Sequence, residues 1–182
     1  MFALGAFQSF YYCHFASPRS DRVLYRAVRR SGASRILELG MGTGRRAARL
    51  IRMAQHHDQP GAVRYVGLDP FEARTASDGP GMSLKLAYRM LRATGARVQL
   101  LPGEPLAVLA QAANSLGPVD LVIFSARLDP RLLAETWYYV PRLLHSESEV
   151  YVETELPGNG RSLRCVEPGE IAALVSTRRR AA

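Results

Sequence analysis

The sequence has few cysteines, almost no lysine and no long apolar run, and each shortage excludes a class of protein. Its only cysteines, Cys13 and Cys165, stand far apart and outside any CxxC pair, so neither a disulfide framework nor a thiolate zinc site is predicted. No apolar run reaches the roughly 18 residues that span a bilayer. The apolar N-terminal stretch has no Lys or Arg before Arg19, which is not typical of a signal peptide. We therefore expect a soluble, cytoplasmic protein without a membrane partner.

Basic residues are abundant, and nearly all of them are arginine. The formal net charge is +8, and Lys85 is the only lysine among 24 basic residues. Clustered cations bind nucleic-acid backbones, so an RNA-binding face is one interpretation. Solvated arginines at ordinary surface positions are the other and the favoured one, because a genome rich in G and C places arginine there.

Short apolar runs alternate with segments of helical period along most of the chain. The predicted strands cover 35–39, 63–68, 97–101, 119–124 and 150–153, and several of these runs are too continuous for one-sided strands. The segments between them carry apolar residues at i, i+3, i+4 and i+7. A length of 182 residues suits one domain. The sequence predicts a single α/β domain with a doubly wound, mostly parallel sheet and helices on both faces.

The two ends of the chain are expected to depart from this alternation. Residues 1–33 form an aromatic and helical cap segment in front of the binding domain at 34–182. After the fifth strand, one added strand at 161–166 and a short helix at 168–175 are predicted, so the C-terminal strand pair is shortened. Asp129 is a candidate N-cap before Pro130, and the helix that follows should kink or end before Pro141.

The first strand ends in a glycine-rich turn that opens directly into a helix, with the sequence Glu38-Leu39-Gly40-Met41-Gly42-Thr43-Gly44. In an open α/β sheet the ligand binds outside the carboxyl ends of the strands, and glycines let it approach the backbone closely. A dinucleotide fingerprint needs its last glycine where Arg45 stands, and a P-loop needs Gly-Lys-Ser/Thr. NAD and nucleoside triphosphates are therefore disfavoured.

An acidic residue two positions before a GxGxG turn resembles the first motif of the class I S-adenosylmethionine-dependent methyltransferases. The resemblance covers residues 34–155 and is nearest to the small-molecule O-methyltransferases. It implies S-adenosylmethionine as the cofactor. By this resemblance the methionine portion is lined by the backbone of the turn, with Glu38 nearby. The turn residues concerned are Gly40, Met41, Gly42 and Gly44.

Three further segments follow later strands at the same edge. Asp69-Pro70 ends the second strand, where the family has its ribose-binding acid, and a carboxylate there can accept both ribose hydroxyls. Gly103-Glu104 follows the third strand, where the family often has an acid near the adenine amino group. A turn former at Asp69 and a helix-start acid at Glu104 are the alternatives without a ligand. Ser125, after the fourth strand, completes the predicted cofactor set.

The sequence shows no metal site and no clear catalytic base. Metal-dependent members of the family carry an aspartate after the fourth strand, where Ser125 stands here, and Asp129 follows too late to replace it. No catalytic metal is predicted. Tyr11, Tyr12 and His14 are candidates for a lid and an acid/base group over the site, with ordinary packing as the alternative.

These features predict an S-adenosylmethionine-dependent, metal-independent methyltransferase that acts on an unidentified small molecule. Two alternatives stay open. One is a catalytically inactive, methyltransferase-like binding or scaffold protein, because the C-terminal region is short and no base is evident. The other is an RNA-binding methyltransferase, on the basis of charge alone.

Overall fold

The computed structural model describes residues 6–55, 61–158 and 160–181. Its sheet has six strands in the order β3-β2-β1-β4-β5-β6. Neighbouring strands pair in parallel, except β5 and β6, which are antiparallel. The strands are β1 (Arg35–Leu39), β2 (Arg64–Asp69), β3 (Arg97–Pro102), β4 (Leu121–Phe124), β5 (Glu149–Leu156) and β6 (Gly160–Val166). The predicted doubly wound, mostly parallel sheet is confirmed, and β6 is the single strand expected after β5.

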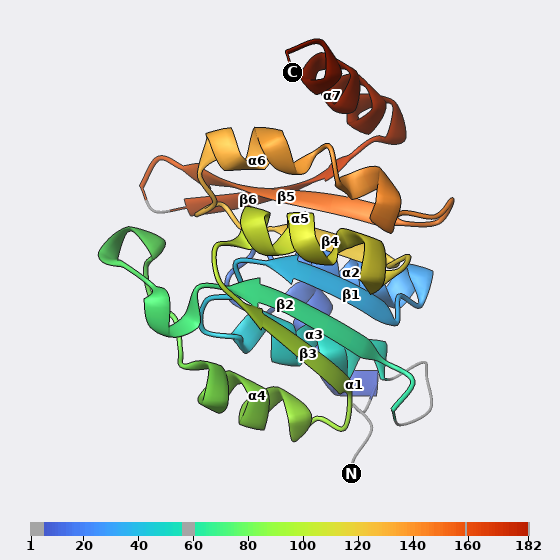
Figure 1. Cartoon of the computed structure of the whole chain (residues 1–182). Coiled ribbons are helices and arrows are strands. Elements are labelled where there is room, and N and C mark those ends of the chain that lie inside the picture. The colour runs from blue at the N-terminus through green and yellow to red at the C-terminus, as the bar shows by residue number, and fades with distance from the viewer. Residues whose placement is uncertain (1–5, 56–60, 159, 182) are drawn as a thin grey trace.

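Helices cover both faces of this sheet (Figure 1). One face carries α1 (Ala6–His14), α2 (Arg22–Ser31), α3 (Arg45–Ala54) and α4 (Leu84–Arg92). The other face carries α5 (Pro105–Leu116), α6 (Pro130–Thr136), the 3-10 helix η3 (Val140–Leu143) and α7 (Pro168–Ala181). Two short 3-10 helices, η1 (Phe71–Ala73) and η2 (Ala76–Asp78), lie in the connection from β2 to α4.

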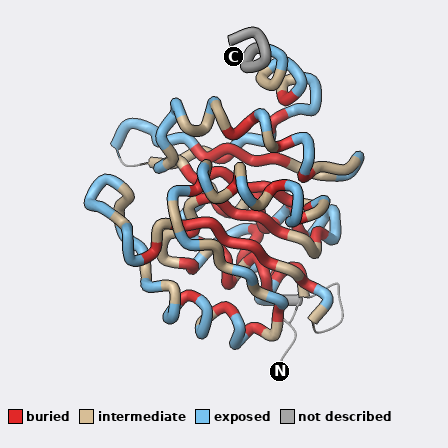
Figure 2. The backbone as a smooth tube through the Cα atoms, in the orientation of Figure 1, coloured by how far each residue is buried: buried red, intermediate tan, exposed pale blue. Residues whose placement is uncertain are grey.

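The alternation of side chains along each strand divides the core into two clusters. In β1, Ile36 faces the side of α1 to α4, whereas Leu37 and Leu39 face the side of α5 to α7. Figure 2 shows the central strands buried along most of their length. Because side chains alternate, Glu38 shares the face of Ile36 and points toward the helices that include α3. An acid thus enters the core where the first strand ends.

The N-terminal segment packs into the same core as the sheet. Tyr12, Leu24, Tyr25 and Val28 belong to the cluster that contains Ile36. Within the part of the chain that the structure describes, no helix is both long and apolar enough to cross a membrane.

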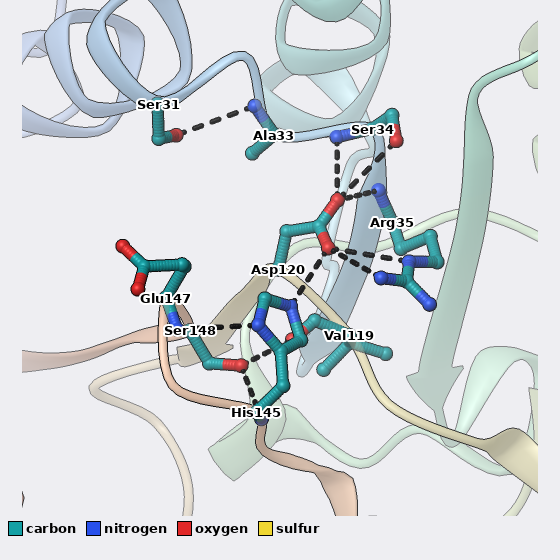
Figure 3. A network of polar contacts seen from close by, with 9 residues as sticks. All are labelled: Ser31, Ala33, Ser34, Arg35, Val119, Asp120, His145, Glu147 and Ser148. Atoms are coloured by element: carbon teal, nitrogen blue, oxygen red, sulfur yellow. Dashed lines mark hydrogen bonds and ion pairs between the residues drawn. The ribbon is translucent and has the colours of Figure 1, made fainter.

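A polar network ties the amino ends of the strands together, at the edge opposite the glycine-rich turn (Figure 3). Asp120, just before β4, accepts hydrogen bonds from the backbone N–H groups of Ser34 and Arg35, both at 2.8 Å. Its other oxygen lies 3.0 Å from Nε2 of His145. This carboxylate therefore joins the starts of β1 and β4 to the turn before β5.

Candidate functional site

The glycine-rich turn lies at the carboxyl ends of β1 and β4 and holds a backbone that few other residues could adopt. Gly40, Gly42 and Gly44 have φ values of +80°, +57° and +65°. A Cβ on Gly40 would lie 2.8 Å from Cβ of Ser125, closer than such atoms approach in folded proteins. Glycine at position 40 therefore lets the turn rest directly on the end of β4.

Asp69, the last residue of β2, is fully buried and already has several partners. Its Oδ2 accepts the N–H of Gly42 at 2.9 Å, and its Oδ1 accepts the N–H of Phe71 at 3.0 Å. Nη2 of Arg74 bonds both carboxylate oxygens. This acid thus joins the glycine-rich turn to the segment that follows β2, and Arg74 bonds the two oxygens to which the sequence assigned the ribose hydroxyls.

Residues 74–81 form a strap against the glycine-rich turn, where a Cβ on Gly42 would lie 3.4 Å from the carbonyl oxygen of Pro80. The carbonyl oxygen of Asp78 accepts bonds from Nη1 of Arg74 at 2.5 Å and from Nη1 of Arg127 at 3.2 Å. A Cβ on Gly81 would lie 2.2 Å from Nε of Arg74, and this Nε is buried without a hydrogen-bond partner among the described residues. The strap therefore fits closely around the side chain of its own first residue, Arg74, and is bonded by Arg127 from the segment after β4.

Glu104 begins α5 as its N-cap. Its carboxylate accepts the N–H groups of Leu106 at 3.0 Å and Ala107 at 2.8 Å. Gly103, just before it, donates its N–H to the carbonyl oxygen of Asp69 at 3.1 Å. The helix-start alternative for Glu104 is thus realised in the structure, and the residue also borders the cavity described next.

A cavity of about 930 Å³ opens at this edge of the sheet, within the roughly 300–1,000 Å³ usual for small-molecule sites. Of the residues predicted to bind the cofactor, six line it: Gly40, Met41, Gly42, Pro70, Glu104 and Ser125. The other four do not line it: Glu38, Gly44, Asp69 and Gly103. Glu38 and Asp69 are fully buried, so they support residues of the wall or of the turn.

Arg46 holds together a buried ionic cluster next to this cavity. Its Nε lies 2.8 Å from Glu38, and its Nη1 lies 3.1 Å from Glu153 and 3.6 Å from Asp21. The acids come from β1, from β5 and from the turn before α2, while Arg46 lies in the first turn of α3. The cluster forms because Glu38 of β1 and Glu153 of β5 both point to the face of the sheet that α3 covers, where Arg46 meets them.

The pKa values in this cluster reflect burial opposed by charge. Burial raises the pKa of Glu38, and the Arg46 guanidinium and the hydroxyl of Tyr65 only partly offset it. Burial likewise raises the pKa of Asp21, against the attraction of Arg46. Burial alone would lower the pKa of Arg46, but the surrounding carboxylates raise it. Arg46 therefore stays charged, whereas burial favours the protonated forms of Glu38 and Asp21.

The candidate lid residues do not line the cavity. Tyr12 is buried, with its ring centroid 5.6 Å from that of Tyr25 and Cζ of Arg49 5.6 Å from its own centroid. Tyr11 and His14 are exposed on α1. The structure thus brings none of the three to the site, and Tyr12 has the packing role that was the alternative.

Neither a metal site nor a catalytic triad is found elsewhere among the described residues. Among the residues that the structure describes, no group of three or more His, Cys, Asp or Glu side chains could hold a metal ion. Asp120, His145 and Ser148 lie together in Figure 3, but Oγ of Ser148 donates to the carbonyl of Val119, and Nδ1 of His145 accepts the N–H of Glu147. The serine hydroxyl is therefore not activated by the histidine, and this group is structural.

Sequence reasoning missed Arg46, Glu153, Asp21 and Arg74. Glu153 and Glu38 offered a signal, because each is an acid inside an otherwise apolar strand and a buried acid requires a partner. The identity of that partner carried no sequence signal, since Arg46 and Glu153 are 107 residues apart.

Comparison with known proteins identifies the fold. No protein-family profile matches the chain, and neither does any protein of curated function. Among solved structures, the O-methyltransferase from Bacillus cereus in complex with SAH is similar, with a TM-score of 0.59 and 19% identity over 98% of this chain and 73% of that chain. A TehB-like SAM-dependent methyltransferase from Corynebacterium glutamicum has a TM-score of 0.51 and 15% identity over 92% of this chain and 76% of that one. The chain thus has the Rossmann-like fold of these methyltransferases.

Proposed function

We propose that this protein is an S-adenosylmethionine-dependent methyltransferase that acts on a small molecule in the cytoplasm without a catalytic metal. The observation that carries the proposal is a hydrogen bond of Asp69. Its buried carboxylate, at the end of β2, accepts the N–H of Gly42 in the glycine-rich turn. The sequence assigned both the turn and this acid to S-adenosylmethionine, and the bond brings the two together. The shared fold supports the same assignment.

The described residues fit that cofactor. The turn at Gly40 leaves no space for a side chain, so the backbone itself would border the methionine portion. Asp69 would hold the ribose, and Glu104, which borders the cavity, would face the adenine amino group. When bound, S-adenosylmethionine supplies a methyl group on a sulfonium centre.

Much of the rate enhancement of such a transfer can come from orientation. The protein provides rigid walls for this: the glycine-rich turn rests on β4, and Ala126 donates its N–H to Oε2 of Glu153 at 3.2 Å. No described side chain that lines the cavity is assigned as a general base, since Asp21, a carboxylate that lines it, is paired with Arg46 and bonded by the hydroxyl of Tyr25. No metal ligand set is required by this scheme.

Calorimetric titration with S-adenosylmethionine and S-adenosylhomocysteine tests the proposal. The wild type should bind both in the micromolar range, and Asp69→Ala should lose binding by at least about a hundredfold, which equals about 2.7 kcal/mol. Asp129→Ala is the matched control, because this acid also lines the cavity but caps α6 through the N–H of Arg131. Equal affinity in Asp69→Ala and wild type would refute the assignment of the ribose site.

A cofactor-free binding protein is the second candidate, and one observation favours it. Arg74 already bonds both oxygens of Asp69, so the fold is complete without a ligand at this acid. This candidate predicts no heat of binding with either compound in the wild type.

A further inference from the structure

The cavity has a second side, away from the ribose acid. In the sheet order, β2 and β3 lie on one side of β1, and β4, β5 and β6 lie on the other. Arg161 of β6 and the segment after β4 border the cavity on that second side, together with α3 and the turn before α2. The residues concerned are Ser17, Pro18, Arg45, Arg49, Leu128, Pro130, Leu132 and Arg161.

Three of these residues are arginines whose charge has no dedicated carboxylate; we call Arg45, Arg49 and Arg161 the arginine wall. The side chain of Arg45 is exposed and makes no hydrogen bond or ion pair with any residue that the structure describes. Arg49 donates from Nη1 to the carbonyl oxygen of Ser17 at 2.8 Å, a neutral partner. Arg161 lies 3.7 Å from Glu153, which already holds Arg46 at 3.1 Å.

The acids on this side of the cavity are engaged elsewhere. Asp129 caps α6, with its Oδ1 2.7 Å from the N–H of Arg131. Asp21 faces Arg46 at 3.6 Å. An anion that enters here therefore meets guanidinium groups with donors to spare, and planar guanidinium groups bind carboxylates and phosphates through paired hydrogen bonds.

The rest of the wall is apolar. Leu128, Pro130 and Leu132, from the segment after β4 and the start of α6, line the cavity, as does Pro18. Leu128 is partly buried and packs against the core. This surface suits the hydrocarbon body of a small molecule, because burial of apolar area is favourable.

We propose that the arginine wall binds the anionic group of the methyl acceptor, so that the acceptor is a small organic acid with an apolar body. The inference rests on the proposed methyltransferase function and names its substrate class. A carboxylate and a phosphate present the same chemistry to these guanidinium groups, and the experiment below tests both.

The experiment measures ligand binding to the protein saturated with S-adenosylhomocysteine, by saturation-transfer NMR and calorimetry. The probes are benzoate and phenyl phosphate, with benzamide as the uncharged match for benzoate. At least one acid should bind, and benzamide should bind at least about tenfold more weakly. The double variant Arg45→Gln/Arg161→Gln should weaken the acid by about tenfold or more. Arg131→Gln, an exposed arginine of α6 that does not line the cavity, should bind it as the wild type does. Thermal unfolding shows whether each variant is folded.

Three results would overturn the proposal. The first is that neither acid binds, and the second is that benzamide binds as tightly as benzoate. The third concerns the carboxylate of the cofactor itself. If the double variant binds S-adenosylhomocysteine more weakly than the wild type does, but binds 5′-methylthioadenosine, which lacks the amino-acid portion, equally well, the arginine wall binds the cofactor and not the acceptor. Failure of the wild type to bind S-adenosylhomocysteine would refute the proposed function separately. Binding of the acids to the free protein would then show an anion site without methyl transfer.

Discussion

Replacement of Arg74 by glutamine should weaken the folded protein and yet strengthen cofactor binding. Arg74 bonds both oxygens of Asp69, the acid assigned to the ribose. Ribose hydroxyls can reach that carboxylate only if the guanidinium leaves it. Removal of the arginine therefore removes a competitor that belongs to the protein itself.

The magnitude follows from the partners of Asp69. In the free protein Arg74 bonds the carboxylate of Asp69, and in the complex the ribose hydroxyls would replace it. The N–H groups of Gly42 and Phe71 would stay bonded to the carboxylate in both states. Bonds to charged groups are each worth about 1.5–3 kcal/mol, and the hydroxyls regain part of that. A net gain of about 1.4 kcal/mol is tenfold in affinity. Without ligand, loss of a buried partner should lower the free energy of unfolding by about 3 kcal/mol.

Calorimetry with S-adenosylhomocysteine and urea unfolding together check this prediction. Arg127→Gln is the control, because Arg127 shares the carbonyl of Asp78 with Arg74 but makes no bond to Asp69. It should loosen the strap and leave the affinity much less changed. If Arg74→Gln binds the cofactor product as weakly as the wild type or more weakly, the competition does not exist.

Three further predictions concern stability, each measured by urea unfolding. Arg46→Gln leaves its three acids without their shared cation and should cost about 3–5 kcal/mol at pH 7. Burial raises the pKa values of Glu38 and Asp21, and Arg46 opposes this rise. Removal of Arg46 should raise both pKa values further, so the loss should grow as the pH rises from about 4, and an equal loss at pH 5 and pH 8 would contradict this. Burial raises the pKa of Asp120, but hydrogen bonds from the backbone N–H groups of Ser34 and Arg35 and from His145 outweigh burial, so the net shift of the pKa is downward. The stability that this carboxylate contributes is therefore present above about pH 4 and is lost as the pH falls through the lowered pKa. Asp120→Asn should cost about 2 kcal/mol at pH 7 and little near pH 2, and a cost independent of pH would argue against this role. Gly40→Ala should destabilise more than Gly32→Ala, because both have positive φ but only position 40 would force a Cβ to 2.8 Å from Ser125; equal losses would show that the contact does not matter.

The fold could be read from the sequence because its signals are local. A continuous apolar run marks β4, and a run interrupted only by Glu38 marks β1, where every residue but Arg35 is buried. Asp129 caps α6 as expected. The helix α6 also ends before Pro141. The sequence predicted a helical cap segment over residues 1–33 but did not place helix α1 within it, since the exposed side of this helix bears Phe7 and Phe10 in place of polar residues.

The candidate site was predictable only in part. The glycine-rich turn and Asp69 carry motifs within a few residues, and the structure joins them through one hydrogen bond. The Arg46 cluster and the arginine wall depend on which of many arginines reach the same cavity, and that is decided by sheet order and helix packing. A composition with 24 basic residues gives no means of selecting Arg46 or Arg161 in advance.

The most direct test of the account is a crystal structure of the protein with S-adenosylhomocysteine. We expect the ligand in the cavity beside Gly40, its ribose hydroxyls on the carboxylate of Asp69, and Arg74 moved away from that acid. A structure at saturating ligand in which Arg74 still bonds Asp69 and the ligand lies elsewhere, or does not bind, would contradict the assignment of this edge of the sheet as a cofactor site.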